Sequence, residues 1–358
     1  MTNLHSVLVV GGCGFLGHHI VDFLLAKNEN IQISVMGRSN TRHRRPQVQY
    51  LEGDLLSESS VQSIFHQANP QVVINTVAPI TFPRNGTPDS HYRINVDGTS
   101  NLLRAAAACP STAAFIYTSS AHTVLATDYT DAKESDSVDD HRDSRRFPTS
   151  TKALADAATL AANNALPIKA GGLRTATIRP CAIFGEDDSQ LLPTILSQLD
   201  HGQQNYQIGH NTAMYDFVYV GNVAEAHILA AEALVRESAG AAEEGKQVSG
   251  ESFLITNDDP QHFYDFMRKV WSASGYGVSE LKPWIIPSKL ALELGSAGNL
   301  ATWASTLGGK SSSTLSRESI EHLCLNRIHD ISKAKTRLYY TPLVSVDEGI
   351  LRGVKSLS

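Results

Sequence analysis

Short apolar segments alternate with longer amphipathic segments through the first half of the chain. The apolar segments have the length of buried strands and span residues 7–10, 33–36, 72–78, 114–120 and 175–180. Apolar positions recur at helical spacing in the segments between them. Strands that are apolar on both faces and separated by helices are typical of a parallel sheet covered on both sides. The pattern therefore predicts a doubly wound α/β fold.

Three glycines follow the first predicted strand at the spacing of a dinucleotide-binding turn. They are Gly11, Gly14 and Gly17, and an amphipathic helix follows directly. The first glycine allows the tight turn, the second lets the backbone approach a pyrophosphate, and the third lets helix and strand pack closely. The helix N-terminus then offers N–H groups and a partial positive charge to the phosphates. We therefore predict a Rossmann-type dinucleotide site that includes Phe15 and Leu16.

Further cofactor contacts are expected where the next strands end. Asp54 follows the third strand and is placed to accept a hydrogen bond from an adenine amino group. The other predicted contacts are Leu55, Val77 and Ala78.

The alternation of strands and helices weakens after about residue 185. We assign residues 1–185 and 216–235 to the Rossmann domain, and residues 186–215 and 236–358 to a smaller substrate-binding lobe. Apolar and aromatic residues in the late half suit a small hydrophobic substrate. The segment 128–146 is highly charged and has almost no aliphatic side chains, so we expect an exposed loop there.

The end of the second strand bears on the choice of nicotinamide cofactor. Sites that prefer NAD place a carboxylate there, against the ribose 2′-hydroxyl. This chain has Gly37 followed by Arg38, with further arginines at 42, 44 and 45. A guanidinium can bind a 2′-phosphate through two hydrogen bonds. The sequence favours NADP(H), with NAD(H) left open; a solvated arginine loop is the alternative interpretation.

Charge and cysteine usage argue against several classes of function. The formal net charge is −6 and the sequence pI is about 6.1, which argues against a nucleic-acid partner. The four cysteines are scattered without a CxxC pair, so we expect reduced thiols and predict neither a disulfide framework nor a metal site.

The N-terminal residues bear on location. The first ten residues lead directly into the glycine turn and leave no room for a secretory signal, so we expect a cytoplasmic protein. The segment from Glu293 to Lys310 is too short and too polar to span a bilayer. For the apolar segment 284–294, packing in the core or over the substrate is favoured. Peripheral contact with a membrane, such as the endoplasmic reticulum surface, is the alternative.

Nine segments spread over nearly the whole chain carry a family resemblance. They are VVGGCGFLGHHIV, EGDL, YRINVDGTSNLLRAA, FIYTSS, TKALADA, IRPCAIFGEDD, YDFVYVGNVAEAHILAA, GESFLITNDDP and KAKTRLYYTPLVSVDEGI. They resemble the extended short-chain dehydrogenase/reductase superfamily, in its 3β-hydroxysteroid dehydrogenase branch, particularly the fungal sterol-4α-carboxylate 3-dehydrogenases. One departure is Tyr339, where the branch usually has glycine.

The resemblance implies an NAD(P)-dependent oxidoreductase that acts on a hydroxyl or ketone of a sterol or terpenoid-like substrate. If that substrate carries a carboxylate β to the new ketone, loss of CO₂ follows easily. The small-residue face of the predicted helix 151–162 matches the face that family members use for dimerisation, so a homodimer is compatible with the sequence.

In that family a serine, a tyrosine and a lysine carry catalysis. The serine hydrogen-bonds the reacting oxygen, the tyrosine transfers the proton, and the lysine binds the nicotinamide ribose and lowers the tyrosine pKa. By residue-to-residue match, the serine corresponds to Ser120 and the lysine to Lys152. Asn95 matches an asparagine that supports the site, and Arg179 and Pro180 begin the segment that passes the nicotinamide.

The tyrosine of this family is missing from the chain. The usual pattern is Tyr-x-x-x-Lys, and the residue four before Lys152 is Pro148. Matching the aromatic–proline pair instead places Phe147 at the tyrosine position, with one extra residue before the lysine. Neither side chain can carry a proton, and one inserted residue rotates a helix by about 100°. The chain is therefore slow at carbonyl chemistry, uses another proton carrier, or does no redox chemistry.

Several other side chains are candidates for the proton carrier. His122 lies two residues past Ser120 and titrates in the right range, and the others are Tyr129, His141 and Tyr215. For each of them a loop or packing role is the alternative interpretation. Ser120 and Lys152 can also act without a phenol, because a desolvated lysine can lose its proton and serve as the base.

Three functions stay open on this sequence. The first is the oxidoreductase that the resemblance implies. The second is a non-redox isomerase, cyclase or lyase of secondary metabolism, which would use the same scaffold for orientation and electrostatics. The third is a cofactor-binding protein without catalytic activity.

Restoring the phenol tests the missing tyrosine directly. If only the hydroxyl is missing, Phe147→Tyr should raise oxidoreductase activity toward the roughly 10²–10⁴-fold that general acid–base help typically supplies. The measurement is the rate of nicotinamide absorbance change with substrate. No gain would mean that the inserted residue has reshaped the site.

Overall fold

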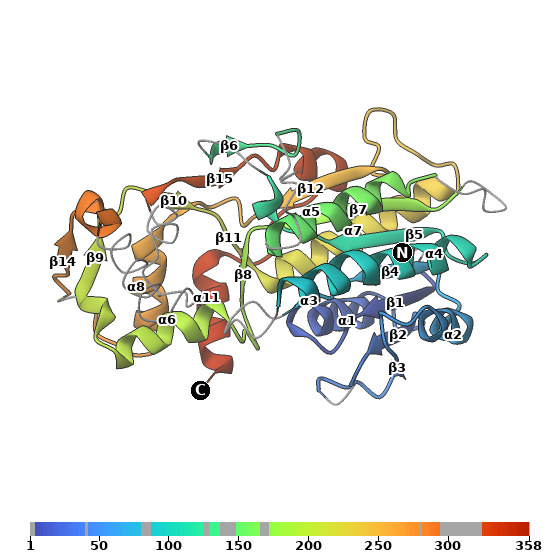
Figure 1. Cartoon of the computed structure of the whole chain (residues 1–358), viewed down its shortest axis with the longest axis horizontal. Helices are drawn as coiled ribbons and strands as arrows, with labels where there is room; N and C mark the ends of the chain where they lie inside the picture. Colours follow the sequence, from blue (N-terminus) through green and yellow to red (C-terminus); the bar gives the residue numbers. More distant parts are fainter. Residues whose placement is uncertain are drawn as a thin grey trace.

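Seven parallel strands form the central sheet of the molecule (Figure 1). The computed structural model describes residues 4–39, 42–79, 87–124, 129–136, 148–164, 172–278, 281–293 and 324–357. The strand order is β12-β7-β5-β4-β1-β2-β3, and every neighbouring pair is parallel. The bounds are β1 (Ser6–Val10), β2 (Gln32–Gly37), β3 (Val48–Glu52), β4 (Val72–Asn75), β5 (Ala114–Thr118), β7 (Arg174–Pro180) and β12 (Glu251–Ile255). The predicted α/β fold is confirmed.

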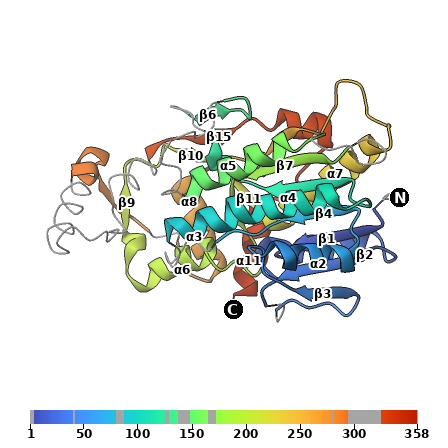
Figure 2. The same cartoon turned by 45° about the vertical axis from the view of Figure 1, so that its right-hand side comes forward.

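Helices cover both faces of this sheet (Figure 2). One face is covered by α1 (Phe15–Lys27) and α7 (Val220–Ser238), and the other by α2 (Glu58–Ala68), α4 (Gly98–Ala108) and α5 (Pro148–Ala161). Within β1, Val7 and Val9 belong to the first core and Leu8 and Val10 to the second. Burial on both faces is the reason why the strand segments are continuously apolar.

The last strand of the sheet corrects the predicted domain boundaries. Residues 236–358 were assigned to the substrate-binding lobe, yet β12 pairs with β7 in the central sheet, with Phe253 opposite Ile178. Phe253, Leu254 and Ile255 are fully buried there. The strand follows helix α7, so it closes one more strand–helix–strand unit beyond the point where the alternation weakens. The rest of the predicted division stays a prediction.

The charged segment before α5 is not simply an exposed loop. Its described part contains β6 (Tyr129–Ala132), which pairs with β15 (Arg327–His329). Tyr129 is only 8% exposed and its hydroxyl donates to the Val124 carbonyl at 2.7 Å. The prediction of an exposed loop is therefore wrong for residues 129–132. The partner strand lies about 200 residues away in sequence, and that pairing buries one side of an otherwise charged segment.

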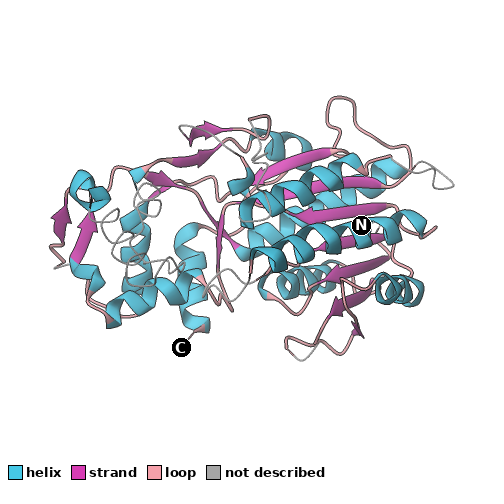
Figure 3. Ribbon diagram, viewed as in Figure 1, coloured by secondary structure: helices cyan, strands magenta, loops and turns pink. Residues whose placement is uncertain are grey.

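Small sheets and helices make up the second lobe (Figure 3). One sheet has the order β13-β10-β15-β6, and the pairs β11-β8 and β14-β9 complete the set. Phe217 and Phe266 stack at 3.6 Å between ring centroids in the lobe's core. The bounds are β8 (Ala182–Phe184), α6 (Leu191–Asp200), β9 (Tyr206–Ile208), β10 (Met214–Tyr215), β11 (Phe217–Tyr219), β13 (Gln261–His262), α8 (Phe263–Ala273), β14 (Trp284–Ile286) and α11 (Val346–Ser356).

The remaining described helical turns are short. They are α3 (Pro88–Tyr92), a π-helical turn at Arg93–Asp97, 3₁₀ turns at Ala121–Thr123 and Gln203–Asn205, and a second π-helical turn at Ala334–Leu338. Among the helices that the structure describes, none combines the length and the apolar character of a membrane span.

A buried ion pair fixes α5 to the sheet. The Arg179 guanidinium on β7 donates two hydrogen bonds of 2.9 Å to the Asp156 carboxylate on α5. The two side chains are only 4% and 1% exposed. A two-bond arginine–carboxylate contact also sets orientation, because both groups are planar. The pair therefore sets the position of the helix that carries Lys152.

Removing the carboxylate should be costly. Asp156→Ala leaves the buried Arg179 charge without the carboxylate that it contacts, which typically costs about 3–5 kcal/mol of unfolding free energy. Urea denaturation measures the loss, with Asp200→Ala on the exposed end of α6 as the control. Equal, small effects of the two substitutions would contradict the structural role of the pair.

Candidate active site

The glycine turn is shaped for close backbone contact. Gly11 has a φ of +83°, and the Gly14 N–H donates to the Gly11 carbonyl at 2.8 Å. A Cβ on Gly17 would lie 2.2 Å from the Gly11 carbonyl oxygen, so no side chain fits there. Gly14 begins α1 and no side chain caps that helix end. The turn thus leaves a bare helix N-terminus, which fits the pyrophosphate of a dinucleotide.

The other predicted cofactor residues lie along the same edge of the sheet. Asp54 is exposed, and its Oδ1 accepts from the Leu56 N–H at 2.9 Å. Leu55 is buried against Gly98, the first residue of α4. After β4, Val77 is half-buried and Ala78 is exposed. These residues follow the carboxyl ends of β3 and β4, where a ligand of an open parallel sheet binds.

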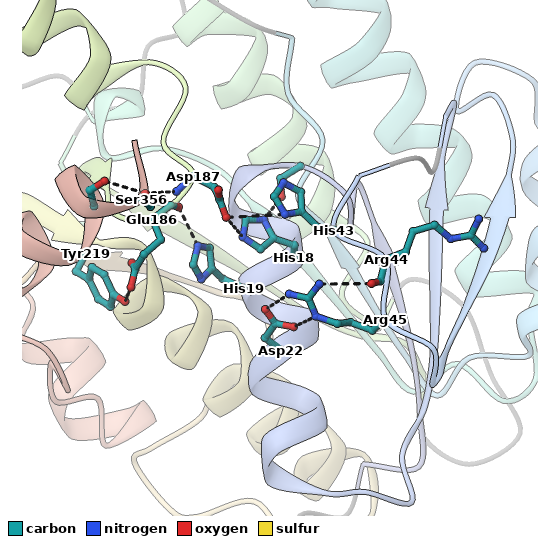
Figure 4. Close-up of polar contacts among 12 residues, drawn as sticks. His18, His19, Asp22, His43, Arg44, Arg45, Glu186, Asp187, Tyr219 and Ser356 are labelled. Atoms are coloured by element: carbon teal, nitrogen blue, oxygen red, sulfur yellow. Dashed lines mark hydrogen bonds and ion pairs between the residues drawn. The ribbon is translucent and has the colours of Figure 1, made fainter. Parts of the chain in front are cut away.

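The predicted arginines have different surroundings. Arg38 is exposed at the end of β2. Arg45 binds the Asp22 carboxylate on α1 with two bonds of 2.7 Å (Figure 4), so its charge is already paired. The Arg44 guanidinium lies 4.6 Å from the centroid of the Tyr50 ring. Of these three, Arg38 directly follows β2, where the sequence predicts contact with the ribose.

Ser120 and His122 form one hydrogen-bonded pair after β5. The Ser120 Oγ accepts from the His122 backbone N–H at 3.2 Å and lies 3.2 Å from the His122 Nδ1. Ser120 is half-buried, whereas His122 is exposed. The imidazole is therefore close enough to exchange a proton with the serine hydroxyl.

Lys152 reaches the same end of β5 from helix α5. Its Nζ donates to the Thr118 carbonyl at 2.5 Å and lies 4.8 Å from the Tyr117 ring centroid. Burial lowers the pKa of Lys152 to about 8, and the nearby Asp156 carboxylate opposes the shift. The structure thus brings Lys152 to within two positions of Ser120 along the strand end.

Asn95 supports this helix from the side. It lies in the π-helical turn before α4, and its Nδ2 donates to the Thr151 Oγ1 at 2.9 Å. The Asn95 Oδ1 is buried and has no hydrogen-bond partner among the described residues. π-Helical turns often occur at functional sites. Pro180, at the carboxyl end of β7, is buried on the strand next to β5.

The chain matches a known protein family over most of its length. The family described as 3-beta hydroxysteroid dehydrogenase/isomerase matches residues 8–287. The chain belongs to this family.

Its curated relatives are enzymes. A sterol-4-alpha-carboxylate 3-dehydrogenase, decarboxylating, of Saccharomyces cerevisiae is 32% identical, covering 98% of this chain and 97% of the relative. The enzyme of the same name from Schizosaccharomyces pombe is 33% identical, with coverage of 98% and 96%. The bovine enzyme is 29% identical, with coverage of 97% and 91%. The resemblance found in the sequence is confirmed.

Solved structures share the fold of this chain at low sequence identity. The Bordetella bronchiseptica enzyme WbmH, solved in complex with NAD+, has a TM-score of 0.69 and 16% identity, with 99% of both chains covered. A UDP-galactose 4-epimerase has a TM-score of 0.68 and 16% identity, with 98% of both chains covered. At such identity the likeness establishes the Rossmann-like fold alone.

The residues that could replace the family tyrosine lie in different parts of the structure. Phe147 and His141 lie outside the described residues. Tyr129 is buried with its hydroxyl on the Val124 carbonyl. Tyr215 lies in the second lobe, where its ring packs 5.0 Å from that of Phe263 and burial raises its pKa to about 12. Among the described candidates, His122 contacts Ser120 directly, and Lys152 reaches Thr118, two positions before it.

One buried residue near the site was missed in the sequence. His227 on α7 places its Nε2 2.8 Å from the Thr118 Oγ1 and its Nδ1 2.8 Å from the Val223 carbonyl. Burial lowers the pKa of His227 to about 4, so the ring is neutral at pH 7. Because a carbonyl only accepts, Nδ1 donates and Nε2 accepts from the threonine hydroxyl. The ring thus anchors the residue whose carbonyl holds Lys152.

The glycine turn gives a matched pair of variants. Gly17→Ala should lose dinucleotide binding and lower the melting temperature, because its Cβ would clash with the Gly11 carbonyl. Gly14→Ala should lower the melting temperature less than Gly17→Ala, because its Cβ would make a tight contact of 3.2 Å with that oxygen and no overlap. It should still weaken dinucleotide binding, because the methyl group stands where the pyrophosphate approaches the backbone. Thermal melting and fluorescence titration with NADPH measure the two effects. Normal binding by Gly17→Ala would refute the assignment.

Proposed function

We propose that this protein is a nicotinamide-dependent oxidoreductase that oxidises a ring hydroxyl of a sterol or terpenoid-like substrate, with loss of CO₂ where a carboxylate lies β to the new ketone. The observation that carries the proposal is the match to sterol-4-alpha-carboxylate 3-dehydrogenases over 98% of the chain. The presence of Ser120 and Lys152 together at the carboxyl end of β5 supports it.

NADP(H) is the cofactor we propose, with NAD(H) as the alternative. Gly11, Gly14 and Gly17 would hold the pyrophosphate, Asp54 the adenine, and Arg38 the 2′-phosphate. Gly37 supports this preference, because no carboxylate stands there to repel a phosphate. The NAD+ in the structure of the neighbour WbmH supports the alternative. When bound, the nicotinamide supplies a hydride acceptor.

Ser120 and Lys152 divide the work on the substrate hydroxyl. The Ser120 hydroxyl would hydrogen-bond the reacting oxygen. The neutral Lys152 amine would take the proton as the O–H and C–H bonds break, and the carbonyl forms. Because the Lys152 pKa lies near 8, the amine is partly neutral close to neutral pH. His122, whose Nδ1 lies 3.2 Å from the Ser120 Oγ, would orient the serine hydroxyl.

The protonated lysine then favours the second step. Loss of CO₂ breaks the bond from the ring to the carboxyl carbon and leaves its electron pair as an enolate. A cation beside the enolate oxygen stabilises the charge that develops there. Lys152, protonated in the first step, is that cation and returns its proton to the product.

The pH profile tests Lys152 as the base. Its lowered pKa means that the neutral fraction rises through about pH 8, so turnover of a 4-carboxysterol with NADP⁺ should rise with pH and level off above that point. Lys152→Arg cannot lose its proton in this range and should be inactive throughout, while NADPH binding persists. Lys355→Arg on α11 is the control. A flat profile in the wild type would contradict the role of Lys152.

A second candidate function has one observation in its favour. The Phe147–Pro148 pair at the tyrosine position is what a non-redox isomerase, cyclase or lyase would tolerate. Product formation without any change in nicotinamide absorbance would favour it. Cofactor binding without product from any sterol or terpenoid would favour a catalytically silent binding protein.

We also propose a cytoplasmic protein that rests against a membrane such as the endoplasmic reticulum surface. The apolar segment 284–293 supports this, because Trp284 is 77% exposed, Ile285 49% and Leu290 48%. Several large apolar side chains exposed within one short segment are compatible with a binding surface. A homodimer through α5 is the further proposal, and the exposed Leu154 on that helix supports it.

A further inference from the structure

Three side chains from distant parts of the chain converge beside the glycine turn (Figure 4). His18 lies on α1, His43 on the loop between β2 and β3, and Asp187 on the loop after β8. The Asp187 Oδ2 lies 3.3 Å from the His18 Nε2 and 3.8 Å from the His43 Nδ1. The two imidazole rings stack at 4.0 Å with an angle of 9° between their planes.

Both ring nitrogens of His18 face hydrogen-bond acceptors, so a neutral ring has one N–H too few to satisfy them. Its Nδ1 lies 2.9 Å from the Gly14 carbonyl oxygen, and its Nε2 faces the Asp187 carboxylate. Both neighbours only accept hydrogen bonds, whereas a neutral imidazole has a single N–H. Either the ring carries two protons, or a cation lies between one ring nitrogen and the carboxylate.

The surroundings of His18 favour the second arrangement. Its side chain is 4% exposed, and the His19 and His43 rings lie 4.1 and 4.0 Å from its own between centroids. A second proton would place a charge in a largely desolvated site beside other imidazoles. With the ring N–H on the Gly14 carbonyl, the Nε2 lone pair faces a carboxylate oxygen, and a cation between them removes that repulsion.

We propose that His18, His43 and Asp187 bind a divalent transition-metal ion, for which zinc is the best match. Two imidazole nitrogens and one carboxylate oxygen are a set that zinc accepts, whereas magnesium and calcium prefer oxygen ligands. A tetrahedron with bonds of about 2.0–2.1 Å has edges of roughly 3.4 Å. The 3.3 Å separation fits that edge. The His43 ring is stacked on His18 without the ion, so it would turn out of that stack to direct its Nδ1 lone pair at the same ion.

The surroundings resemble those of metal sites in two further ways. Metal-binding histidines usually donate their other ring N–H to a carbonyl or carboxylate, which fixes the tautomer, and Gly14 does this for His18. The side chains of Asp187 and His43 are 46% and 27% exposed, so an ion can enter and a water can complete the coordination.

The ion would join three segments that are distant from one another along the chain. His18 is one residue past Gly17, and His43 is on the loop that also carries Arg44 and Arg45. The Asp187 N–H donates to the Ser356 Oγ of α11 at 3.0 Å. The metal would therefore connect the dinucleotide turn and the arginine loop to the second lobe. The role is a structural cross-link, and it does not depend on redox activity.

The test is metal binding by the chelator-treated full-length protein, without substrate or cofactor. Zinc should bind at one equivalent per chain in calorimetry and raise the melting temperature. Cobalt(II) should give the visible absorption bands of a tetrahedral site. Asp187→Asn and His43→Gln, which alter partly exposed residues, should each weaken zinc binding at least tenfold. His66→Gln, on the exposed face of α2, should leave it unchanged.

Two results would overturn the proposal. One is the absence of stoichiometric zinc binding, together with nitrogen NMR chemical shifts that identify His18 as doubly protonated at neutral pH. The other is binding that persists in Asp187→Asn and His43→Gln, which would move the metal to other histidines or cysteines. Neither result bears on the proposed oxidoreductase activity, because no turnover is measured.

Discussion

Helix α1 packs so closely on the glycine turn that no side chain fits at Gly17. The rest of the site depends on this close packing. Because the Gly11 carbonyl lies where a Cβ would be, the helix starts directly over the end of β1. Its first N–H groups then lie at the carboxyl edge of the sheet. Val77 follows β4 and Ser120 follows β5 at this same edge. His18, the next residue on the helix, is directed toward the second lobe by the same packing.

Burial of titratable groups is the second physical feature that the proposed chemistry depends on. It is the largest cause of the lowered pKa of Lys152, His227 and His18. Burial disfavours the charged form of a base, so all three are shifted toward neutrality. For Lys152 this makes an amine that can accept a proton near neutral pH. For the two histidines it favours a neutral ring, and the backbone carbonyl that accepts from Nδ1 leaves Nε2 as the acceptor.

The parts of the molecule that local sequence determines were predictable. The glycine spacing predicted the tight turn between β1 and α1, and continuous apolar runs predicted the first strands, because each strand is buried on both faces. Dinucleotide binding at this turn stays a prediction. Ser120 and Lys152 came from the family resemblance, and the fold brings them to one end of β5.

The parts that depend on distant pairing were not predictable. β12 lies beyond the region of regular alternation, and β6 is buried only because β15 pairs with it from the other end of the chain. The group His18, His43 and Asp187 is invisible in the sequence, since its members are 25 and 144 residues apart. The sequence around His227 predicts only a helix, and its contact with Thr118 depends on how that helix packs on β5.

The central claim is that this protein transfers a hydride to the nicotinamide without the catalytic tyrosine of its family. Isotopic labelling tests it most directly. A 4-carboxysterol with deuterium on the hydroxyl-bearing carbon is incubated with the protein and NADP⁺, and the reduced nicotinamide is analysed by mass spectrometry. The account predicts one deuterium in the nicotinamide for each ketone formed. Product that keeps its deuterium, with the nicotinamide unchanged, would contradict it.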